Sequence, residues 1–272
     1  MKVVLFCGGM GMRIRPLGPG GGSEDSTPKP MVTVGGRHPL LWHVMKYYAH
    51  YGHTDFVLCL GYGADTIKKY FLEYNEYMSN DFVMTDGGHG LELKNRDIAD
   101  WRIHFVDTGL NSNVGTRLWR VRHLLQDEPM FLANYADGLS DLPHPEYQRS
   151  FEESGKLAAC VCVRPPASGH VARVDADGNV NRVETYEEAD LWINGGYFIL
   201  KREIFDYMKE GEELVREPFQ RLIDKRLLYG HTYRGFWQCC DTFKEKQDLD
   251  QRFAAGDRPW QVWESADPGA GI

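Results

Sequence analysis

The chain begins with an apolar run, Val3-Val4-Leu5-Phe6-Cys7, which leads directly into the glycine-rich stretch Gly8-Gly9-Met10-Gly11-Met12-Arg13. A short apolar run bounded by glycine is typical of a buried strand. Glycines after such a strand let successive backbone N–H groups face one concavity, where phosphate oxygens bind. The stretch therefore predicts an α/β fold whose first strand ends at a phosphate-binding turn, although an ordinary tight turn has the same pattern.

Arg13 helps to distinguish two kinds of nucleotide-binding turn. It stands where a dinucleotide-binding loop would carry its third glycine, and no acidic residue ends a second strand at the distance expected for a ribose contact. A nicotinamide-dependent oxidoreductase is therefore disfavoured. A guanidinium at this position instead suits a phosphate group.

A second basic residue, Lys29, follows within the stretch Pro28-Lys29-Pro30-Met31. The two prolines fix the local backbone and favour an extended conformation, so the ammonium group is presented stiffly. A surface lysine in a proline-containing loop is the alternative. Together with Arg13 it predicts a site for a polyphosphate, and the Gly- and Ser-rich segment 18–27 between them is expected to be a mobile loop.

Charge and composition exclude several classes of function. With a net charge of -8 over 272 residues, the chain has no general electrostatic affinity for nucleic acid or an anionic membrane. It has no run of about 18 apolar residues, and its N-terminus lacks the features of an export signal. Its six cysteines form no Cys-x-x-Cys pair, so we expect reduced thiols and a cytoplasmic location. A metal site at Cys160 and Cys162 is disfavoured because no second ligand pair matches it.

Apolar runs alternate with helical patterns in the first half of the chain, which predicts a mostly parallel sheet covered on both faces. The second half is expected to add a hairpin that turns at Asp177-Gly178. Strands are expected over residues 2–7, 55–60, 101–106, 130–135, 157–163, 192–200 and 231–240, the hairpin over 170–186, and helices over 40–50, 64–77, 116–125, 203–208, 217–228 and 242–255. We expect one catalytic domain over residues 1–264, with a nucleotide-binding half (1–140) and a sugar-phosphate-binding half (141–264), and a flexible tail over 265–272.

Two acidic residues follow apolar strands in this pattern. Asp137 ends the run at 130–135, and Asp241 follows the run that closes with Cys239-Cys240. Ligands of open α/β sheets bind beyond the carboxyl ends of the strands, and Mg²⁺ takes one or two carboxylates together with substrate phosphates and water. The pair therefore predicts a magnesium site. A helix N-cap is the alternative role for each residue.

With these motifs in place, the chain resembles the sugar-1-phosphate nucleotidyltransferases, and more closely the glucose-1-phosphate cytidylyltransferases. The resemblance runs from Val3 to about Glu264. Its motifs are Gly8-Gly9-x-Gly11-x-Arg13, Pro28-Lys29-Pro30-Met31, Leu41-Trp42-His43-Val44-Met45-Lys46, Gly61-Tyr62-Gly63, Val106-Asp107-Thr108-Gly109, Asp137-Gly138-Leu139-Ser140-Asp141, Trp192-Ile193-Asn194-Gly195-Gly196, Gly235-Phe236-Trp237, Asp241-Thr242 and Pro259-Trp260.

The resemblance implies a Rossmann-like sheet with a small added sugar-binding hairpin and a specific reaction. A phosphate oxygen of a sugar 1-phosphate attacks the α-phosphorus of a nucleoside triphosphate, with CTP favoured, and pyrophosphate leaves. It further implies a homo-oligomer. In the implied site, Arg13 and Lys29 are catalytic residues, and they bind the nucleotide together with Gly8, Gly9, Gly11, Gly115 and Arg117. The sugar is bound by Glu184, Thr185, Asn194 and Gly195, and Mg²⁺ is bound by Asp137 and Asp241.

Several positions depart from the family pattern. The family has a lysine that binds the sugar phosphate, and the corresponding segment here, Glu184-Thr185-Tyr186, lacks it. Arg173, Arg182 or His170 would have to supply the positive charge instead. The family's Thr-Gly-Gly-Arg becomes Val114-Gly115-Thr116-Arg117, which bears on the preference for CTP, and Met12 and Ala136 replace the usual threonine and glycine. We interpret these changes as a drift of substrate, so that the acceptor is a phosphorylated molecule other than glucose 1-phosphate. A catalytically silent nucleotide-binding homologue is the alternative.

Overall fold

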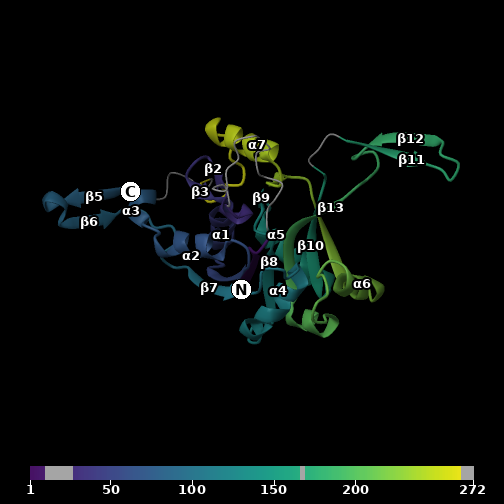
Figure 1. Cartoon of the computed structure of the whole chain (residues 1–272), viewed down its shortest axis with the longest axis horizontal. Helices are drawn as coiled ribbons and strands as arrows, with labels where there is room; N and C mark the ends of the chain where they lie inside the picture. The colour runs from purple at the N-terminus through teal and green to yellow at the C-terminus, as the bar shows by residue number, and fades with distance from the viewer. Residues whose placement is uncertain (10–26, 166–168, 265–272) are drawn as a thin grey trace.

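A seven-stranded sheet runs through the whole molecule (Figure 1) in the order β14-β10-β13-β8-β1-β4-β7. The computed structural model describes residues 1–9, 27–165 and 169–264. The sheet strands are β1 (Lys2–Phe6), β4 (Asp55–Leu60), β7 (Arg102–Asp107), β8 (Met130–Asn134), β10 (Ala158–Val163), β13 (Ile193–Lys201) and β14 (Leu228–Tyr233). All neighbouring pairs are parallel except those of β13, which runs antiparallel to both β8 and β10. The mostly parallel sheet predicted from the sequence is therefore confirmed.

The central strand β1 is buried on both faces, as its unbroken apolar sequence predicts. Val3 and Leu5 belong to one apolar cluster and Val4 and Phe6 to the other, because successive side chains of a strand point to opposite faces. Residues 1–140 and 141–264 both supply strands to this sheet, so the two halves of the chain share one core.

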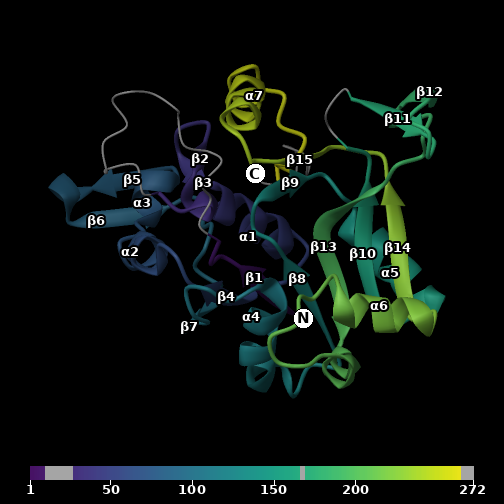
Figure 2. The ribbon, with the colours of Figure 1, turned by 45° about the vertical axis from the view of Figure 1, so that its right-hand side comes forward.

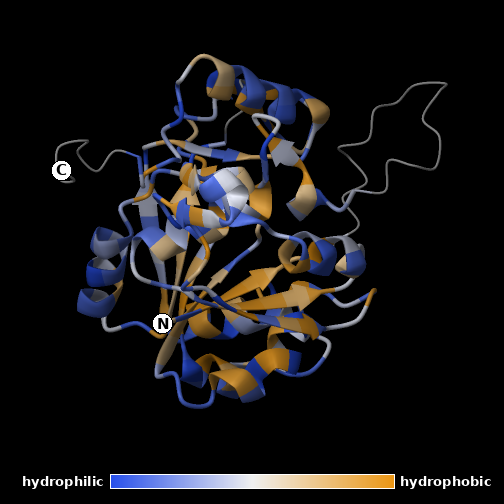
Figure 3. Ribbon diagram, turned by 90° about the vertical axis from the view of Figure 1, so that its left-hand side faces the viewer, coloured by the Kyte–Doolittle hydropathy of each residue, from blue (hydrophilic) through white to orange (hydrophobic). Residues whose placement is uncertain are grey.

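Helices cover both faces of the sheet (Figure 2). One face is covered by α1 (Leu40–His50), α2 (Ala64–Leu72) and α5 (His144–Ser154), and the other by α4 (Val114–Val121) and α6 (Glu217–Asp224). The final helix, α7 (Phe243–Ala254), contributes Leu249 to the same cluster as α1. Figure 3 shows strands of the sheet that are mostly hydrophobic, beside helices that carry both hydrophobic and hydrophilic residues.

Four two-stranded ladders are added to this frame. They are β2 (Thr33–Val34) with β3 (His38–Pro39), β5 (Phe82–Thr85) with β6 (Gly90–Leu93), β9 (Gly138–Ser140) with β15 (Trp237–Cys239), and β11 (His170–Val174) with β12 (Val180–Thr185). The hairpins β5–β6 and β11–β12 project from opposite ends of the molecule (Figure 1). The predicted hairpin turn is confirmed, because Gly178 adopts a φ of 86° between β11 and β12.

Four predicted elements are wrong in extent. The helix expected over 217–228 ends at Asp224 as α6, because Leu228 already begins β14. The expected helix over 64–77 is two helices, because Asn75 accepts a hydrogen bond from the N–H of Tyr77 at 3.0 Å and starts α3 (Glu76–Ser79). The expected strand over 231–240 is two strands, β14 in the main sheet and β15 on β9. The helix expected over 116–125 begins earlier, at Val114, and continues beyond Val121 only as a 3₁₀ helix.

The remaining differences concern segments without a clear sequence signal. The sequence predicted neither the β5–β6 hairpin nor α5. The expected mobile loop, except for Thr27, and the expected flexible tail lie outside the described residues. Within the described part of the chain, no helix is long and apolar enough to cross a membrane.

Candidate active site

The β9–β15 ladder brings two distant acidic residues together. Asp137 directly precedes β9, and Asp241 lies two residues beyond β15. Because the two strands are antiparallel, the start of β9 lies beside the end of β15, where Gly138 pairs with Cys239. The backbone N–H of Cys240 also donates to the carbonyl of Asp137 at 2.9 Å. The backbone thus places both carboxylates at the same edge of the molecule.

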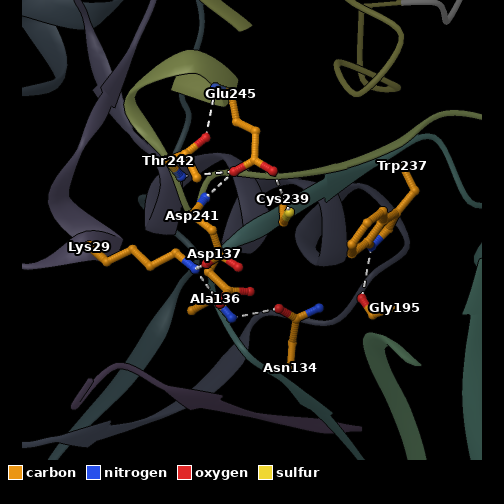
Figure 4. Close-up of polar contacts among 10 residues, drawn as sticks. All are labelled: Lys29, Asn134, Ala136, Asp137, Gly195, Trp237, Cys239, Asp241, Thr242 and Glu245. Atoms are coloured by element: carbon orange, nitrogen blue, oxygen red, sulfur yellow. Dashed lines mark hydrogen bonds and ion pairs between the residues drawn. The ribbon is translucent and has the colours of Figure 1, made fainter. Parts of the chain in front are cut away.

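Lys29 lies between these two carboxylates (Figure 4). It begins a 3₁₀ helix, Lys29–Met31, after Pro28 in extended conformation. Its Nζ donates to Oδ2 of Asp137 at 2.7 Å and also to Oδ1 of Asp241. Since both oxygens contact one nitrogen, the two carboxylates are close enough to share a single cation.

The local charges shift the pKa values of this group. Burial by itself would lower the pKa of Lys29, but the two carboxylates outweigh it and raise that pKa above its ordinary value. For Asp137, burial is the largest influence and raises the pKa, although Lys29 opposes the rise and 30 % of the side-chain surface is exposed. Lys29 therefore stays an ammonium group, and its positive charge favours the ionised form of Asp137.

Asp241 is held by the start of α7. Thr242 is the N-cap of this helix, and Glu245 completes a capping box with it. Oε2 of Glu245 accepts from the backbone N–H of Asp241 at 2.7 Å and from that of Thr242 at 2.8 Å (Figure 4). The N-cap is thus Thr242, so the alternative role of Asp241 as a cap is excluded. The Thr-x-x-Glu signal of a capping box is present in the sequence at Thr242 and Glu245.

Arg117 fixes the turn that follows β1. Its guanidinium is buried and donates to the carbonyls of Leu60 at 2.9 Å, Gly109 at 3.0 Å and Gly8 at 3.0 Å, and to Oγ1 of Thr108 at 2.8 Å. A Cβ on Gly8 would lie 2.2 Å from this guanidinium. Gly8 is therefore required by the close approach of Arg117, whose contacts are with the protein. The predicted nucleotide contact of Arg117 stays a prediction.

Gly115, at the start of α4, is also required by packing. A Cβ at this position would lie 2.2 Å from the carbonyl oxygen of Glu212 and 2.8 Å from the nitrogen of Leu214. The helix start is thus pressed against the backbone of the loop before α6. Both segments line the cavity described next, through Val114 and Glu213.

Two cavities meet at Lys29 and Asp137. The first has a volume of about 480 Å³ and extends over the turn after β1 and the segment 110–114. The second has a volume of about 610 Å³ and extends toward β13 and β15. Both are lined by Gly9, Lys29, Tyr135 and Asp137. Two substrates could therefore bind on either side of one cluster of charges, and the glycine turn after β1 lines the first cavity through Gly8 and Gly9.

The second cavity contains two of the predicted sugar-binding residues, Asn194 and Gly195, together with Asp241. Nδ2 of Asn194 donates to the hydroxyl of Tyr135 at 3.0 Å. The carbonyl of Gly195 accepts from Nε1 of Trp237 at 2.8 Å (Figure 4). Tyr135 and Trp237 were not predicted as site residues, since an aromatic residue in a strand is most often part of the core.

The structure separates Glu184 and Thr185 from this cavity. Both lie on β12 of the projecting hairpin, and neither lines the second cavity. Glu184 is 4 % exposed and pairs with Arg173 at 3.3 Å and Arg182 at 2.9 Å. These arginines are therefore engaged by Glu184, and their suggested role as a replacement cation has no support from the geometry.

Thr185 lines a third cavity of about 430 Å³ together with His170 and Trp237. Because Trp237 also lines the second cavity, the two cavities adjoin. The sugar-binding roles of Glu184 and Thr185 stay predictions. Gly11 and Arg13 lie outside the described residues.

The donor set around Lys29 suits a hard cation held partly by substrate. No cluster of three or more His, Cys, Asp or Glu side chains is placed to hold a metal within residues 1–9, 27–165 and 169–264. In this part of the chain, no further His, Cys, Asp or Glu is placed to complete a metal site at Cys160 and Cys162. Two carboxylates alone are the protein ligands that Mg²⁺ commonly takes when phosphates supply the rest.

Comparison with known proteins places the chain among enzymes of one class. It is 34 % identical over 268 residues to the glucose-1-phosphate cytidylyltransferase of Salmonella typhi, an alignment that covers 97 % of this chain and 100 % of that protein. It is 26 % identical to mannose-1-phosphate guanyltransferase 2 of Candida glabrata, covering 87 % of this chain and 60 % of that protein.

A scan against protein-family profiles found no match. Among solved structures, an apo-UDP-glucose pyrophosphorylase shares the fold with a TM-score of 0.64 at 15 % identity, over 94 % of this chain and 99 % of that one. Because the Salmonella relative exceeds 30 % identity over nearly the full length of both proteins, the chain belongs to the glucose-1-phosphate cytidylyltransferase family of sugar-1-phosphate nucleotidyltransferases.

Proposed function

We propose that this protein transfers CMP from CTP to a sugar 1-phosphate or a related phosphorylated acceptor, that the transfer depends on Mg²⁺, and that the residues around Lys29 perform it. Membership of the family supports nucleotidyl transfer onto a sugar 1-phosphate. The observation that carries the proposal for the site is the contact of Lys29 with both Asp137 and Asp241, where the first and second cavities meet.

Asp137 and Asp241 are the residues that would hold the metal. Their oxygens already converge on one positive charge, that of Lys29, so the donor set fits a second cation beside it. Bound there, Mg²⁺ would supply positive charge to the reacting phosphates. Neither carboxylate needs to act as a nucleophile in this reaction.

The protein contributes orientation and charge. An oxygen of the acceptor phosphate attacks the α-phosphorus of CTP, the bond from that phosphorus to the bridging oxygen breaks, and pyrophosphate leaves with the electron pair. Positioning and charge neutralisation carry most of the catalysis in such phosphate chemistry. Lys29, kept charged by its carboxylate partners, would donate to the phosphate oxygens, and Gly9 would approach them with its backbone.

The acceptor is proposed to differ from glucose 1-phosphate. The resemblance implies a lysine in the segment that contains Thr185, and this chain has no lysine there. The nearby Arg173 and Arg182 are paired with Glu184. A hydrogen bond to a charged group contributes about 1.5–3 kcal/mol, so the loss of one should weaken the usual acceptor. CTP is favoured because relatives at 34 % identity are glucose-1-phosphate cytidylyltransferases.

The experiment is a pyrophosphate-release assay of CTP, GTP, UTP, dTTP and ATP against a panel of sugar 1-phosphates, with and without Mg²⁺. We expect metal-dependent release with CTP and at least one acceptor used better than glucose 1-phosphate. Efficient turnover of glucose 1-phosphate alone would refute the change of acceptor. Binding of CTP without release from any pair would refute the catalytic proposal and indicate a silent homologue.

The substitution Lys29→Met tests the assignment of the metal ligands. The ammonium repels a divalent cation bound beside it on the same two carboxylates, so its removal should tighten Mn²⁺ binding to the substrate-free protein at least tenfold, because this Coulomb repulsion is lost. Turnover should nevertheless fall about 100-fold or more, because a preorganised charge on the phosphates is lost. Calorimetric titration with Mn²⁺ and the pyrophosphate assay measure the two effects.

Lys2→Met is the matched control, since Lys2 donates to the carbonyl of Leu124 at the opposite end of β1 from the site. It should change neither quantity. Unchanged or weaker Mn²⁺ binding in Lys29→Met would show that Asp137 and Asp241 do not form the metal site.

A homo-oligomer in the cytoplasm is also proposed. The β5–β6 hairpin exposes Phe82, Val83, Met84 and Leu91 at 40–64 %, and an isolated two-stranded hairpin is marginally stable in water. All six cysteines are free thiols, which supports a reducing compartment. Sedimentation velocity should show a species larger than 31.2 kDa, and a monomer at micromolar concentration would contradict the proposal.

A further inference from the structure

The turn that presents Asp137 contains an unusual backbone conformation. Ala136 has a φ of 60° and is completely buried. Four residues other than glycine have a positive φ among those described, and the other three, Asp86, Asp190 and Arg226, are exposed. Left-handed backbone is unfavourable for L-residues because Cβ crowds the following carbonyl. Alanine has no polar group of its own that could compensate, so the surrounding structure must hold this conformation.

Asn134 provides that support. It is the last residue of β8, it is 1 % exposed, and its Oδ1 accepts from the backbone N–H of Ala136 at 2.7 Å (Figure 4). An asparagine bonded to the backbone two residues further on forms an Asx turn, which replaces a backbone turn. The amide of Asn134 is itself fixed, because its Nδ2 donates to the hydroxyl of Tyr48 at 3.2 Å on α1.

The residue after this turn is Asp137. Its carbonyl is tied to the N–H of Cys240, and its carboxylate contacts Lys29. Because Asp137 follows Ala136 directly, the backbone angles of Ala136 set the direction in which the chain enters Asp137. If Ala136 returned to a right-handed or extended conformation, the chain after it would leave in a different direction, and the carboxylate would turn away from Lys29 and Asp241.

We infer that Asn134 is a positioning residue for the metal-binding carboxylate: it holds Ala136 in the left-handed conformation that directs Asp137 toward Lys29 and Asp241. The pair of Asn134 and Ala136 thus does what a glycine at position 136 would do alone, because glycine adopts positive φ without support. The inference rests on the proposed function, since it takes Asp137 to be a metal ligand.

A double-mutant cycle tests the inference, with N134A, A136G and N134A/A136G compared with the wild type. Binding of CTP in the presence of Mg²⁺, without acceptor, is measured by calorimetry, and the urea midpoint of unfolding is measured in parallel. N134A alone should weaken CTP binding about tenfold and lower the urea midpoint. In the A136G background the same substitution should weaken binding less than twofold, since glycine no longer needs the Asx turn.

Y48F is the matched control. It removes the hydrogen bond from Nδ2 of Asn134 to Tyr48 and leaves the turn intact, so CTP binding should stay within twofold of the wild type. The cycle also subtracts the loss of the Tyr48 contact, because N134A removes it in both backgrounds.

An equal loss of CTP binding on N134A in both backgrounds, or no loss in either, would overturn the inference. Failure of the proposed function has a different result: D137N would bind CTP with the same dependence on Mg²⁺ as the wild type. The rescue by A136G is the decisive measurement, because a merely structural role of Asn134 would not depend on the residue at position 136.

Discussion

At the scale of single residues, the site depends on groups whose partners come from distant parts of the chain. Lys29 contacts carboxylates 108 and 212 positions away, and Asp241 is held by the side chain of Glu245. Each charged group therefore has a defined direction before any substrate binds. Such preorganisation is what makes charges effective in phosphate chemistry.

Arg117 is expected to act through the protein rather than through direct contact with the nucleotide. R117K would break most of the hydrogen bonds that the guanidinium donates to buried oxygens, including the carbonyls of Leu60 and Gly8, because an ammonium group cannot span them. The loss of hydrogen bonds from a buried charged group should lower the free energy of unfolding by about 2–3 kcal/mol. Urea denaturation measures this loss, and KM for CTP should rise as the turn after β1 loosens.

The exposed Arg102 offers a comparison for this substitution, and R102K should change neither stability nor KM. A different result would reverse the assignment: unchanged stability in R117K, with a large loss of CTP affinity, would show that the guanidinium contacts the nucleotide directly.

At the scale of elements, the strands of the main sheet were predictable and the connections were not. The apolar runs at β1 and β4 are buried on both faces, so their sequence patterns were unambiguous. The β5–β6 hairpin was missed because all four residues of β5 are exposed and show no alternation of apolar and polar side chains. The separation of β14 from β15 depends on pairing with β9, which no local pattern reveals.

The same limit applies to the site. Asp137, Asp241 and Lys29 were identified from their positions next to strands and prolines, and the structure places them in contact. The supporting roles of Arg117 and Asn134 could not be predicted, because they depend on backbone groups that approach only in the folded chain.

The capping box of α7 should influence catalysis through Asp241. E245A removes the acceptor for the N–H groups of Asp241 and Thr242, so we expect a loss of about 1–2 kcal/mol in the free energy of unfolding and a fall in kcat that higher Mg²⁺ partly restores. T242A breaks the other half of the box, the hydrogen bond from the N–H of Glu245 at 3.2 Å, and leaves the contact with Asp241.

T242A should therefore lower stability by a similar amount while keeping the Mg²⁺ dependence of the wild type. Activity assays over a range of Mg²⁺ concentrations distinguish the two variants. If both variants, or neither, changed their Mg²⁺ dependence, Glu245 would have no role beyond capping the helix.

At the scale of the whole molecule, the sheet connects the two substrate cavities through its central strands. The first cavity is lined by Phe6 of β1 and the second by Ile193 of β13, with Tyr135 following β8 between them. A shared rigid sheet keeps the two cavities at a fixed spacing. Loss of the folded core should therefore remove both binding sites together.

Acid should weaken this core through two buried histidines, His43 and His144. Burial, with repulsion from neighbouring positive groups, lowers the pKa of each to about 3, and each is 2 % exposed. The unfolded chain, with a pKa near 6.5, takes up protons first, so stability is full above about pH 6.5 and falls as the pH drops toward 3. Each histidine should cost about 2 kcal/mol between pH 7 and 5. Urea unfolding at both pH values measures the loss.

The substitution H43F removes one of the two buried histidines, including two ring nitrogens without hydrogen-bond partners. It should therefore remove the part of the pH dependence that His43 contributes, whereas H123F, at an exposed position, should leave the pH dependence unchanged. An equal free energy of unfolding at pH 7 and 5, or an unchanged pH dependence in H43F, would contradict this account.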